Sequence, residues 1–337
     1  MNATLTNRRV LLTSRPKGVP EADHFTVDEA PAPEIADGEF LVKTEYWSVD
    51  PAMRGWANDA PNYLPPVEIC AVMRSFAVGT IVASRHPDYA EGDVVSGMFG
   101  WQRYAVSDGG NVDRKVEEDD LPPSLALGAL GLNGVTAYFG LIDGCAPVAG
   151  DTVVVSTAAG AVGSAVGQIA QILGCRTVGI TGSAEKAALC TQSLGYDVAI
   201  NYRDEDVSQA LKAACPDGVN CYFDNTCGPI SDAVMTQLAI GARITVCGTV
   251  ALTDWDPIPV GPRVHRQLMV ARARMQGFLI LDYKARFPEA IEQLATWVRE
   301  GKLARNEHIL EGADTAPGAI KMLYEGKNTG KLLIRVD

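Results

Sequence analysis

The chain has 337 residues, of which 47% are hydrophobic and 21% charged, and its formal net charge at pH 7 is −12. This composition is typical of a globular protein with room for two domains, and it excludes a disordered chain. The negative charge argues against nucleic acid and anionic membranes as partners. Because no apolar run could span a bilayer and residues 1–9 lack a signal-peptide pattern, we expect a cytoplasmic protein.

The 8 cysteines and 4 histidines are scattered along the chain, and no two cysteines form a C-x-x-C pair. In a cytosolic protein this pattern is typical of reduced, mostly buried thiols. Zinc needs convergent Cys, His or carboxylate ligands, and no local spacing indicates them. The sequence therefore predicts no metal site, unless ligands distant in the chain meet in the fold.

Residues 1–130 show short strand-like runs between Pro, Gly and Asp, among them Phe40–Glu45, Val78–Ala83 and Val94–Met98. This pattern predicts a mainly β domain with long loops. The loop 48–66 is rich in aromatic residues, Met and Pro. Either it packs on its own domain or it contributes to a ligand site that sets substrate size, with Met53, Arg54 and Tyr63 as candidate substrate contacts.

The second half of the chain alternates between strand and helix patterns. A helix is predicted at 125–142, and the alternation then runs through strand 152–156, helix 162–173, strand 176–181, helix 184–194, strand 197–200, helix 205–214, strand 221–224, helix 231–239 and strand 242–247. Such alternation predicts a doubly wound parallel sheet, an α/β fold of the Rossmann type. Ligands of such sheets bind at the carboxyl ends of the strands.

The turn Thr157–Gly163 consists of small residues between the first strand and its helix. Small residues let the backbone approach a pyrophosphate, and the N–H groups at the helix start face its negative charge. The usual first glycine is Ala158 here, so the alternative is a close-packed βαβ turn without a ligand. The position of this turn, directly between a predicted strand and a predicted helix, favours a dinucleotide-binding site.

The second strand ends without a carboxylate, and Lys186 lies just inside the next helix. An acid at this position binds the ribose of NAD, whereas a cation accommodates the 2′-phosphate of NADP. The sequence therefore favours NADPH, with Tyr202 as a second candidate contact, although Lys186 could also be an ordinary solvated helix residue. No other position separates the two cofactors as directly.

Two further strand ends face the same predicted crevice, one at Asn225 and one at the turn Cys247–Val250. Asn225 can donate and accept hydrogen bonds to a nicotinamide ribose, or it can form a local Asx turn. Residues 253–266 are rich in Pro, Asp and Arg and predict an irregular lid that contains Trp255, a candidate substrate contact. The tail 320–336 ends in an apolar strand that we expect to rejoin the first domain.

Several motifs occur in one order along the chain: Ser48–Pro51 with Met53–Gly55, Gly92–Val95 through Gly100–Gln102, Gly134–Leu141, Ala158–Ser164, Glu185–Lys186, Ala199–Tyr202, Tyr222–Asn225 and Gly326–Lys331. Together they resemble the medium-chain dehydrogenase/reductase superfamily, in its zinc-free branch of prostaglandin, alkenal double-bond and curcumin reductases. The resemblance implies a GroES-like domain (1–130, completed by 302–337), a Rossmann domain (131–301) and usually a homodimer. It also implies hydride transfer from NADPH to the β-carbon of an α,β-unsaturated ketone or aldehyde, with the carbonyl kept.

The family's cofactor contacts are carried over residue by residue onto Gly160, Ala161, Val162, Gly163, Lys186, Tyr202, Asn225, Cys247, Gly248, Thr249, Val250, Phe278, Leu279, Ile280 and Asn328. The segments that bind zinc in other relatives are missing from this chain. One departure concerns catalysis, because Thr253 replaces a tyrosine that helps to place the nicotinamide ribose and the substrate carbonyl. Thr253 or Tyr63 could supply the missing hydroxyl. The alternatives are a zinc-free quinone reductase and a catalytically silent NADPH-binding protein.

Overall fold

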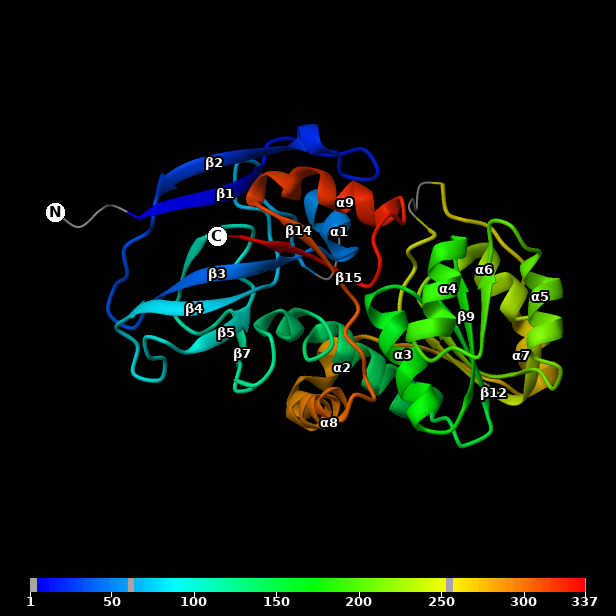
Figure 1. Cartoon of the computed structure of the whole chain (residues 1–337). Coiled ribbons are helices and arrows are strands. Elements are labelled where there is room, and N and C mark those ends of the chain that lie inside the picture. The colour runs from blue at the N-terminus through cyan, green and yellow to red at the C-terminus, as the bar shows by residue number, and fades with distance from the viewer. Residues whose placement is uncertain (1–4, 60–63, 253–256, 337) are drawn as a thin grey trace. The chain divides into compact units, whose positions relative to one another are not determined.

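The computed structural model describes residues 5–59, 64–252 and 257–336 (Figure 1). The chain forms two compact units, the first made of residues 1–128 and 307–337 and the second of residues 129–306. The division predicted from the sequence falls after residues 130 and 301. Within the described residues, no helix is both long and apolar enough to cross a membrane.

The first unit is built on an antiparallel sheet that the end of the chain completes. The main sheet has the order β14-β15-β3-β4-β5-β7, with β6 also paired to β3, and β1 and β2 form a separate ribbon. The strands are β1 (Thr6–Leu12), β2 (Phe25–Pro31), β3 (Phe40–Ser48), β4 (Ala77–Ser84), β5 (Val94–Gly97), β6 (Tyr104–Ser107), β7 (Val112–Lys115), β14 (Glu307–Glu311) and β15 (Lys331–Arg335). Helices α1 (Ala52–Ala57) and α9 (Ala316–Tyr324) belong to the same unit. Because β15 pairs with β3, the tail does join the first unit, as the sequence predicts.

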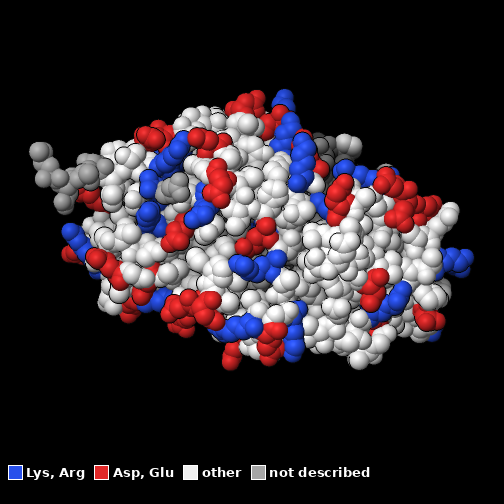
Figure 2. All heavy atoms as spheres, in the orientation of Figure 1, with Lys and Arg blue, Asp and Glu red and all other residues white. Residues whose placement is uncertain are grey.

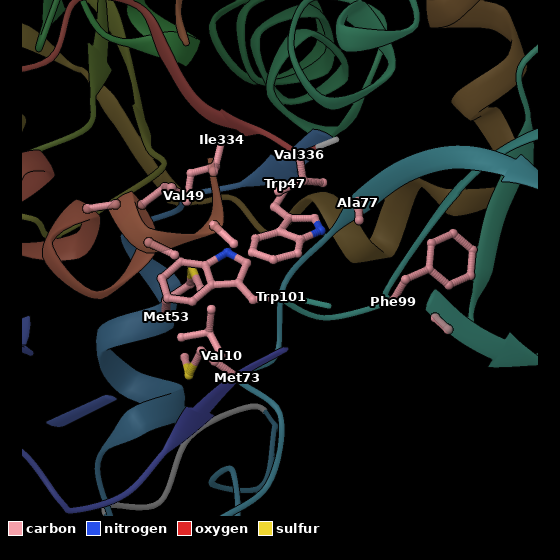
Figure 3. Close-up of a cluster of buried hydrophobic side chains, with 14 of the residues drawn as sticks. Val10, Trp47, Val49, Met53, Met73, Ala77, Phe99, Trp101, Ile334 and Val336 are labelled. Atoms are coloured by element: carbon pink, nitrogen blue, oxygen red, sulfur yellow. The ribbon is translucent and has the colours of Figure 1, made fainter. Parts of the chain in front are cut away.

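Two tryptophans anchor the core of this unit and fix the end of β3. Trp47 and Trp101 are both completely buried, together with Met53, and their side chains lie beside one another in Figure 3. The indole of Trp101 donates to the carbonyl of Ser48 at 3.0 Å, and that of Trp47 donates to the Thr44 hydroxyl at 2.8 Å. Burial of large aromatic side chains with satisfied N–H groups is among the strongest stabilising contributions in a core.

The second unit is a parallel sheet with the strand order β10-β9-β8-β11-β12-β13. Its strands are β8 (Thr152–Ser156), β9 (Arg176–Thr181), β10 (Val198–Asn201), β11 (Val219–Asp224), β12 (Leu238–Val246) and β13 (Arg274–Gly277). Its helices are α2 (Leu132–Phe139), α3 (Ala161–Ile172), α4 (Ala184–Ser193), α5 (Val207–Ala214), α6 (Gly228–Val234), α7 (His265–Ala271) and α8 (Phe287–Arg299). The chain winds in one direction from β8 to β10 and in the other from β11 to β13, so the order reverses between β8 and β11. The predicted doubly wound sheet is confirmed, and this reversal is where such sheets bind ligands.

The predicted helix 125–142 is wrong as one continuous element. The structure has a short 3-10 turn η2 (Pro123–Leu127), then α2, and then a π-helical turn η3 (Gly140–Cys145). Gly128, the C-cap of η2, has φ −117° and ψ −109°, and Gly131, the N-cap of α2, is extended, so both glycines lie outside the helical region. The apolar periodicity continues across both glycines, which is why the sequence pattern suggested one helix.

Candidate cofactor-binding site

The turn between β8 and α3 has the backbone geometry of a phosphate cradle. Gly160 is the N-cap of α3 in an extended conformation, so the helix begins at Ala161 without a side chain over its first N–H groups. A Cβ at Gly160 would lie 2.9 Å from Cγ2 of Thr157, and a Cβ at Gly163 would overlap the Thr157 carbonyl oxygen. Glycine is therefore required at both positions for the helix to start this close to the strand. The turn fits a dinucleotide pyrophosphate.

Thr157 holds this turn in a strained conformation. Its φ is +55°, which a β-branched residue rarely adopts and which costs roughly 1–3 kcal/mol. Backbone hydrogen bonds maintain the shape: the N–H of Ala158 donates to the carbonyl of Ile180 at 3.1 Å, and that of Gly160 donates to Thr157 at 2.9 Å. The strain is thus offset by neighbouring structure at the point where a ligand would bind.

Asn306 is a supporting residue that sequence reasoning missed. Its side-chain amide donates to the carbonyl of Ala159, inside the turn, at 3.2 Å. The segment that carries Asn306 is itself tied to α3, because buried Gln168 accepts from the N–H of Ala304 at 2.7 Å. Asn306 and Ala159 are more than a hundred positions apart in the chain, and no sequence pattern links them.

Asn225 fastens the two strands on either side of the reversal point. Its N–H donates to the Ser156 hydroxyl and its side-chain amide donates to the Ser156 carbonyl, both at 2.8 Å. No residue in the described ranges donates to the amide oxygen of Asn225, which can therefore accept a hydrogen bond from a ligand. The local Asx turn belongs instead to Asp224, whose carboxylate accepts from the N–H groups of Thr226 at 3.0 Å and Cys227 at 2.8 Å.

Asp224 also links the end of β11 to the turn that follows β12. The residue is buried, and its backbone carbonyl accepts from the N–H groups of Cys247 at 2.8 Å and Gly248 at 3.1 Å. Burial, followed by the charge of Asp224, raises the pKa of Cys227 and of Cys247 to about 12 each. Both thiols are therefore neutral near pH 7.

A positive corner lies beyond the ends of β9 and β10. Lys186 is in the first turn of α4, where its N–H donates to the Ser183 hydroxyl at 3.2 Å. The Tyr202 ring lies against Gly182, since a Cβ there would be 2.8 Å from the tyrosine oxygen. Arg203 places its guanidinium 6.0 Å from the centre of that ring. Burial, and then the charge of Arg203, lowers the pKa of Lys186.

This corner fits a 2′-phosphate better than a free ribose. Two cations that repel one another gain from an anion placed between them. Sequence reasoning singled out Lys186 and Tyr202 but not Arg203, although it directly follows the tyrosine. The sequence shows that Arg203 is a cation, but it does not show that the charge of Arg203 acts on Lys186 in the folded protein.

The remaining predicted cofactor contacts in this unit lie after β13. The N–H of Phe278 donates to the carbonyl of Val246 at 3.0 Å, which continues the sheet by one residue. The Phe278 ring packs against Tyr283, with ring centres 5.2 Å apart, and Tyr283 stacks on Phe139. Leu279 is exposed and Ile280 is buried. A contact between Phe278 and a cofactor would thus use its backbone.

The predicted residues of the first unit have separate surroundings. Met53 lies in the hydrophobic core, which agrees with the alternative that the loop packs on its own domain. Arg54 donates through Nε to the carbonyl of Gly18 at 3.2 Å and lies over the Tyr324 ring. Asn328 is buried and donates to the carbonyl of Gly330 at 2.9 Å. Tyr63, Thr253 and Trp255 fall outside the described residues.

Comparisons with known proteins identify the family. Residues 8–114 match the family "N-terminal domain of oxidoreductase", and residues 161–296 match "Zinc-binding dehydrogenase". The chain is 45% identical to the putative NADP-dependent oxidoreductase YfmJ of Bacillus subtilis, over 99% of both chains. It is 43% identical to the NADPH-dependent curcumin reductase of Escherichia coli, over 98% of this chain and 97% of the relative. The chain belongs to the medium-chain dehydrogenase/reductase superfamily, in its zinc-free reductase branch.

Solved structures of this superfamily place the chain in the same branch. CurA from Vibrio vulnificus, determined in complex with NADPH, has a TM-score of 0.91 and 40% identity over 98% of this chain and 99% of CurA. The quinone oxidoreductase of Escherichia coli complexed with NADPH has a TM-score of 0.79 at 17% identity, covering 98% of this chain and 100% of that one, and shows the shared fold alone. The predicted family and fold class are confirmed.

One of the matching families is described as zinc-binding, and the residues of this chain can be compared with what that ion requires. In the part of the chain that the structure describes, no three His, Cys, Asp or Glu side chains gather where they could hold a metal. These residues do not fit a zinc site, and no step of the chemistry below passes through one.

Proposed function

We propose that this member of the superfamily is an NADPH-dependent double-bond reductase. It transfers hydride to the β-carbon of an α,β-unsaturated ketone or aldehyde and keeps the carbonyl. The observation that carries the proposal is the 43% identity, along nearly the whole chain, to a curcumin reductase that uses NADPH. The corner formed by Lys186, Tyr202 and Arg203 supports the choice of the phosphorylated cofactor.

The residues of the second unit orient the cofactor. When bound, NADPH supplies a hydride from its nicotinamide ring. The N–H groups of Ala161, Val162 and Gly163, which follow the Gly160 cap at the start of α3, would hold the pyrophosphate, and the positive corner would bind the 2′-phosphate. Asn225 and the turn Cys247–Val250 would position the nicotinamide end, and holding it against the substrate would lower the barrier by proximity. Asn328 and Phe278–Ile280 remain further proposed contacts.

The substrate needs two further contributions from the protein. As hydride reaches the β-carbon, negative charge moves to the carbonyl oxygen, and a hydrogen-bond donor stabilises the resulting enolate. A proton then adds to the α-carbon. We assign the donor role to Thr253 or Tyr63, and substrate contacts to Arg54, Tyr63 and Trp255, whereas Met53 is completely buried and supports the loop from within the core. A covalent nucleophile is not required, because the cofactor provides the difficult chemistry.

The test is NADPH consumption by the purified protein with a panel of enones, enals and quinones, followed by product identification. A saturated ketone or aldehyde with its carbonyl intact is the expected product. Formation of quinol alone would assign the protein to the quinone reductases. Tight NADPH binding without any turnover would instead support a catalytically silent binding protein.

We also propose that the protein is a homodimer that works in the cytoplasm. β13 is the last strand in the sheet order and pairs only with β12 among the described strands, so its other edge offers unpaired backbone groups. Met275 on this strand and Met269 and Val270 on α7 are exposed apolar residues of the same unit. A second copy that pairs with β13 would cover that edge.

A further inference from the structure

A buried lysine joins the tail of the chain to the loop that follows β3. Lys331 is the first residue of β15, and only 2% of its surface is exposed. Its ammonium group donates to the carbonyl of Val49 at 3.2 Å and forms an ion pair with the carboxylate of Asp50. Lysine is almost never buried to this degree unless an anion pairs with it. Asp50 is the anion that makes this burial possible.

The second carboxylate oxygen of Asp50 has a partner as well. It accepts from the hydroxyl of Ser48, the last residue of β3. The carbonyl of Ser48 in turn accepts from the Ser75 hydroxyl at 2.7 Å and from the indole of Trp101 at 3.0 Å. Asp50 is thus held by a cation from the tail and by a hydroxyl whose own backbone is fixed to the core.

The loop leaves the sheet at Asp50. The N–H of Val49 donates to the carbonyl of Leu332 at 3.1 Å, which extends the pairing of β3 with β15 by one residue. The N–H of Asp50 donates instead to the sulfur of Met53 at 3.4 Å. Pro51 follows as the N-cap of α1. The side chain of Asp50 is therefore a link between the sheet and the start of α1.

Tyr324, the last residue of α9, is a second contact between the tail and this loop. Its hydroxyl donates to the carbonyl of Pro51 at 3.0 Å, and the guanidinium of Arg54 lies 5.9 Å from the centre of its ring. Arg54 is on α1 and is a proposed substrate contact. A buried charge and a phenol from the tail therefore hold the residues directly before the helix that carries Arg54.

Stability alone does not account for a charged anchor at this place. Two charges lose their hydration when they are buried, and apolar side chains of similar volume often replace such a pair without loss of stability. Apolar side chains cannot supply direction, whereas the ammonium of Lys331 donates to two defined oxygens, on Val49 and on Asp50. The ion pair therefore fixes the position of the loop relative to β15.

We propose that Asp50 and Lys331 are positioning residues for the reduction of the enone. The ion pair, with the Ser48 hydroxyl, holds α1 so that Arg54 meets the substrate in one orientation. A misplacement of about 1 Å that originates far from the reacting atoms can slow a reaction on the order of a hundredfold. This inference rests on the proposed function, because it assigns the consequence of the anchor to substrate turnover.

The first experiment compares Lys331→Met with the wild-type protein. Methionine has nearly the length of lysine but cannot donate to Val49 or Asp50. We expect kcat to fall about tenfold or more with the acceptor that the wild type reduces best, because a charge-assisted hydrogen bond and the loop position are lost. The dissociation constant of NADPH should change less than about twofold, because the proposed phosphate contacts belong to the second unit.

Lys327→Met is the matched control. Lys327 is exposed, lies in the same segment of the tail and pairs with Glu325 at the surface. An exposed ion pair of this kind contributes little. This variant should therefore keep the kcat and the NADPH affinity of the wild type.

A double variant separates positioning from stability. Asp50→Asn combined with Lys331→Met leaves neither charge unpaired, so the melting temperature should return toward that of the wild type. Its kcat should stay about tenfold low, because the directed hydrogen bonds are still missing. Ser48→Ala keeps the ion pair and should lower kcat by only about threefold, and it provides a test even if the charge variants do not fold.

Hydrogen exchange gives a readout that needs no turnover. The amides of residues 52–58 should exchange faster in Lys331→Met than in Lys327→Met, because α1 is less firmly held. The proposal is overturned if their exchange does not change, if Lys331→Met keeps the wild-type kcat, or if the double variant regains kcat together with its melting temperature. A wild-type protein that reduces no acceptor contradicts the proposed function, and the exchange rates then decide the anchor by themselves.

Discussion

Lys186 has the clearest individual role at the residue scale. Its amine belongs to a half-buried corner with Tyr202 and Arg203, where a 2′-phosphate would relieve the repulsion between two cations. Lys186→Ala should weaken NADPH binding by about 2 kcal/mol, roughly thirtyfold, because a charge-assisted hydrogen bond is lost. NADH binding, which lacks the phosphate, should change little. Titration of the protein with each nucleotide, followed by fluorescence, measures both constants.

The matched control is Lys212→Ala, an exposed lysine on α5 in the same unit. Lys212→Ala removes one positive charge, as Lys186→Ala does, but it leaves the corner of Lys186, Tyr202 and Arg203 intact. The affinities for NADPH and for NADH should therefore both stay as in the wild type. If Lys186→Ala weakens NADPH and NADH equally, Lys186 does not bind the phosphate and only supports α4.

The thiols of Cys227 and Cys247 give a pH-dependent prediction. Because burial and Asp224 raise their pKa values to about 12, their thiolates form only as the pH approaches that value. Alkylation of both by iodoacetamide should therefore be slow at pH 7 and rise roughly tenfold per pH unit up to pH 9. Peptide mapping of the folded protein at several pH values provides the measurement, with exposed Cys70 as the reference thiol. Fast labelling of Cys227 at pH 7 would show that Asp224 does not hold it neutral.

At the scale of the element, the β8–α3 turn is a strained segment supported by a distant one. Asn306 donates to Ala159 within the turn, and Gln168 ties the neighbouring Ala304 to α3. Asn306→Ala should weaken NADPH binding by about 1 kcal/mol, roughly fivefold, since one supporting hydrogen bond is lost. The same cofactor titration measures this effect.

Lys302→Ala is a suitable control for this element, because Lys302 is exposed, lies in the same segment and pairs with Glu300 rather than with the turn. It should bind NADPH like the wild type. An Asn306→Ala protein with unchanged affinity would mean that the backbone bonds of Thr157 and Ala158 suffice to hold the turn.

At the scale of the whole molecule, the open edge of β13 predicts the oligomeric state. The chain mass is 35.9 kDa, so a dimer has twice that mass, about 72 kDa. Light scattering coupled to size exclusion should give the dimer mass for the wild type. Met275→Glu places a charge on the exposed edge strand and should shift the protein toward the monomer mass.

Val148→Glu provides the comparison for this experiment, because Val148 is 63% exposed in the turn before β8 rather than on the edge strand. This variant should remain a dimer. A wild-type protein that elutes at the monomer mass at micromolar concentration would contradict the dimer, without consequence for the proposed chemistry.

Local features can be predicted from the residues alone: the alternation that makes a doubly wound sheet, the small residues of the turn, and the cation at Lys186. Each depends on the residue types within a few positions, because strand pleat, helix period and glycine conformations are local properties. The sequence also identified the family through motifs in one order, and this is confirmed. The wrong prediction at 125–142 has a local cause as well, since apolar periodicity continues through two glycines, one that ends η2 and one that precedes α2.

Contacts between residues that are distant in the chain follow from the fold and not from any sequence pattern. Asn306 donates to the carbonyl of Ala159, and the Cys221 sulfur lies 3.6 Å from the Cys145 carbonyl oxygen, because strands and helices far apart in the chain pack together. The fold likewise decided that Met53 lies in the core and that the Asx turn belongs to Asp224 rather than Asn225. The physical reason is that burial and hydrogen-bond partners are set by packing across the whole unit, whereas a sequence pattern records only the conformational preferences of neighbours.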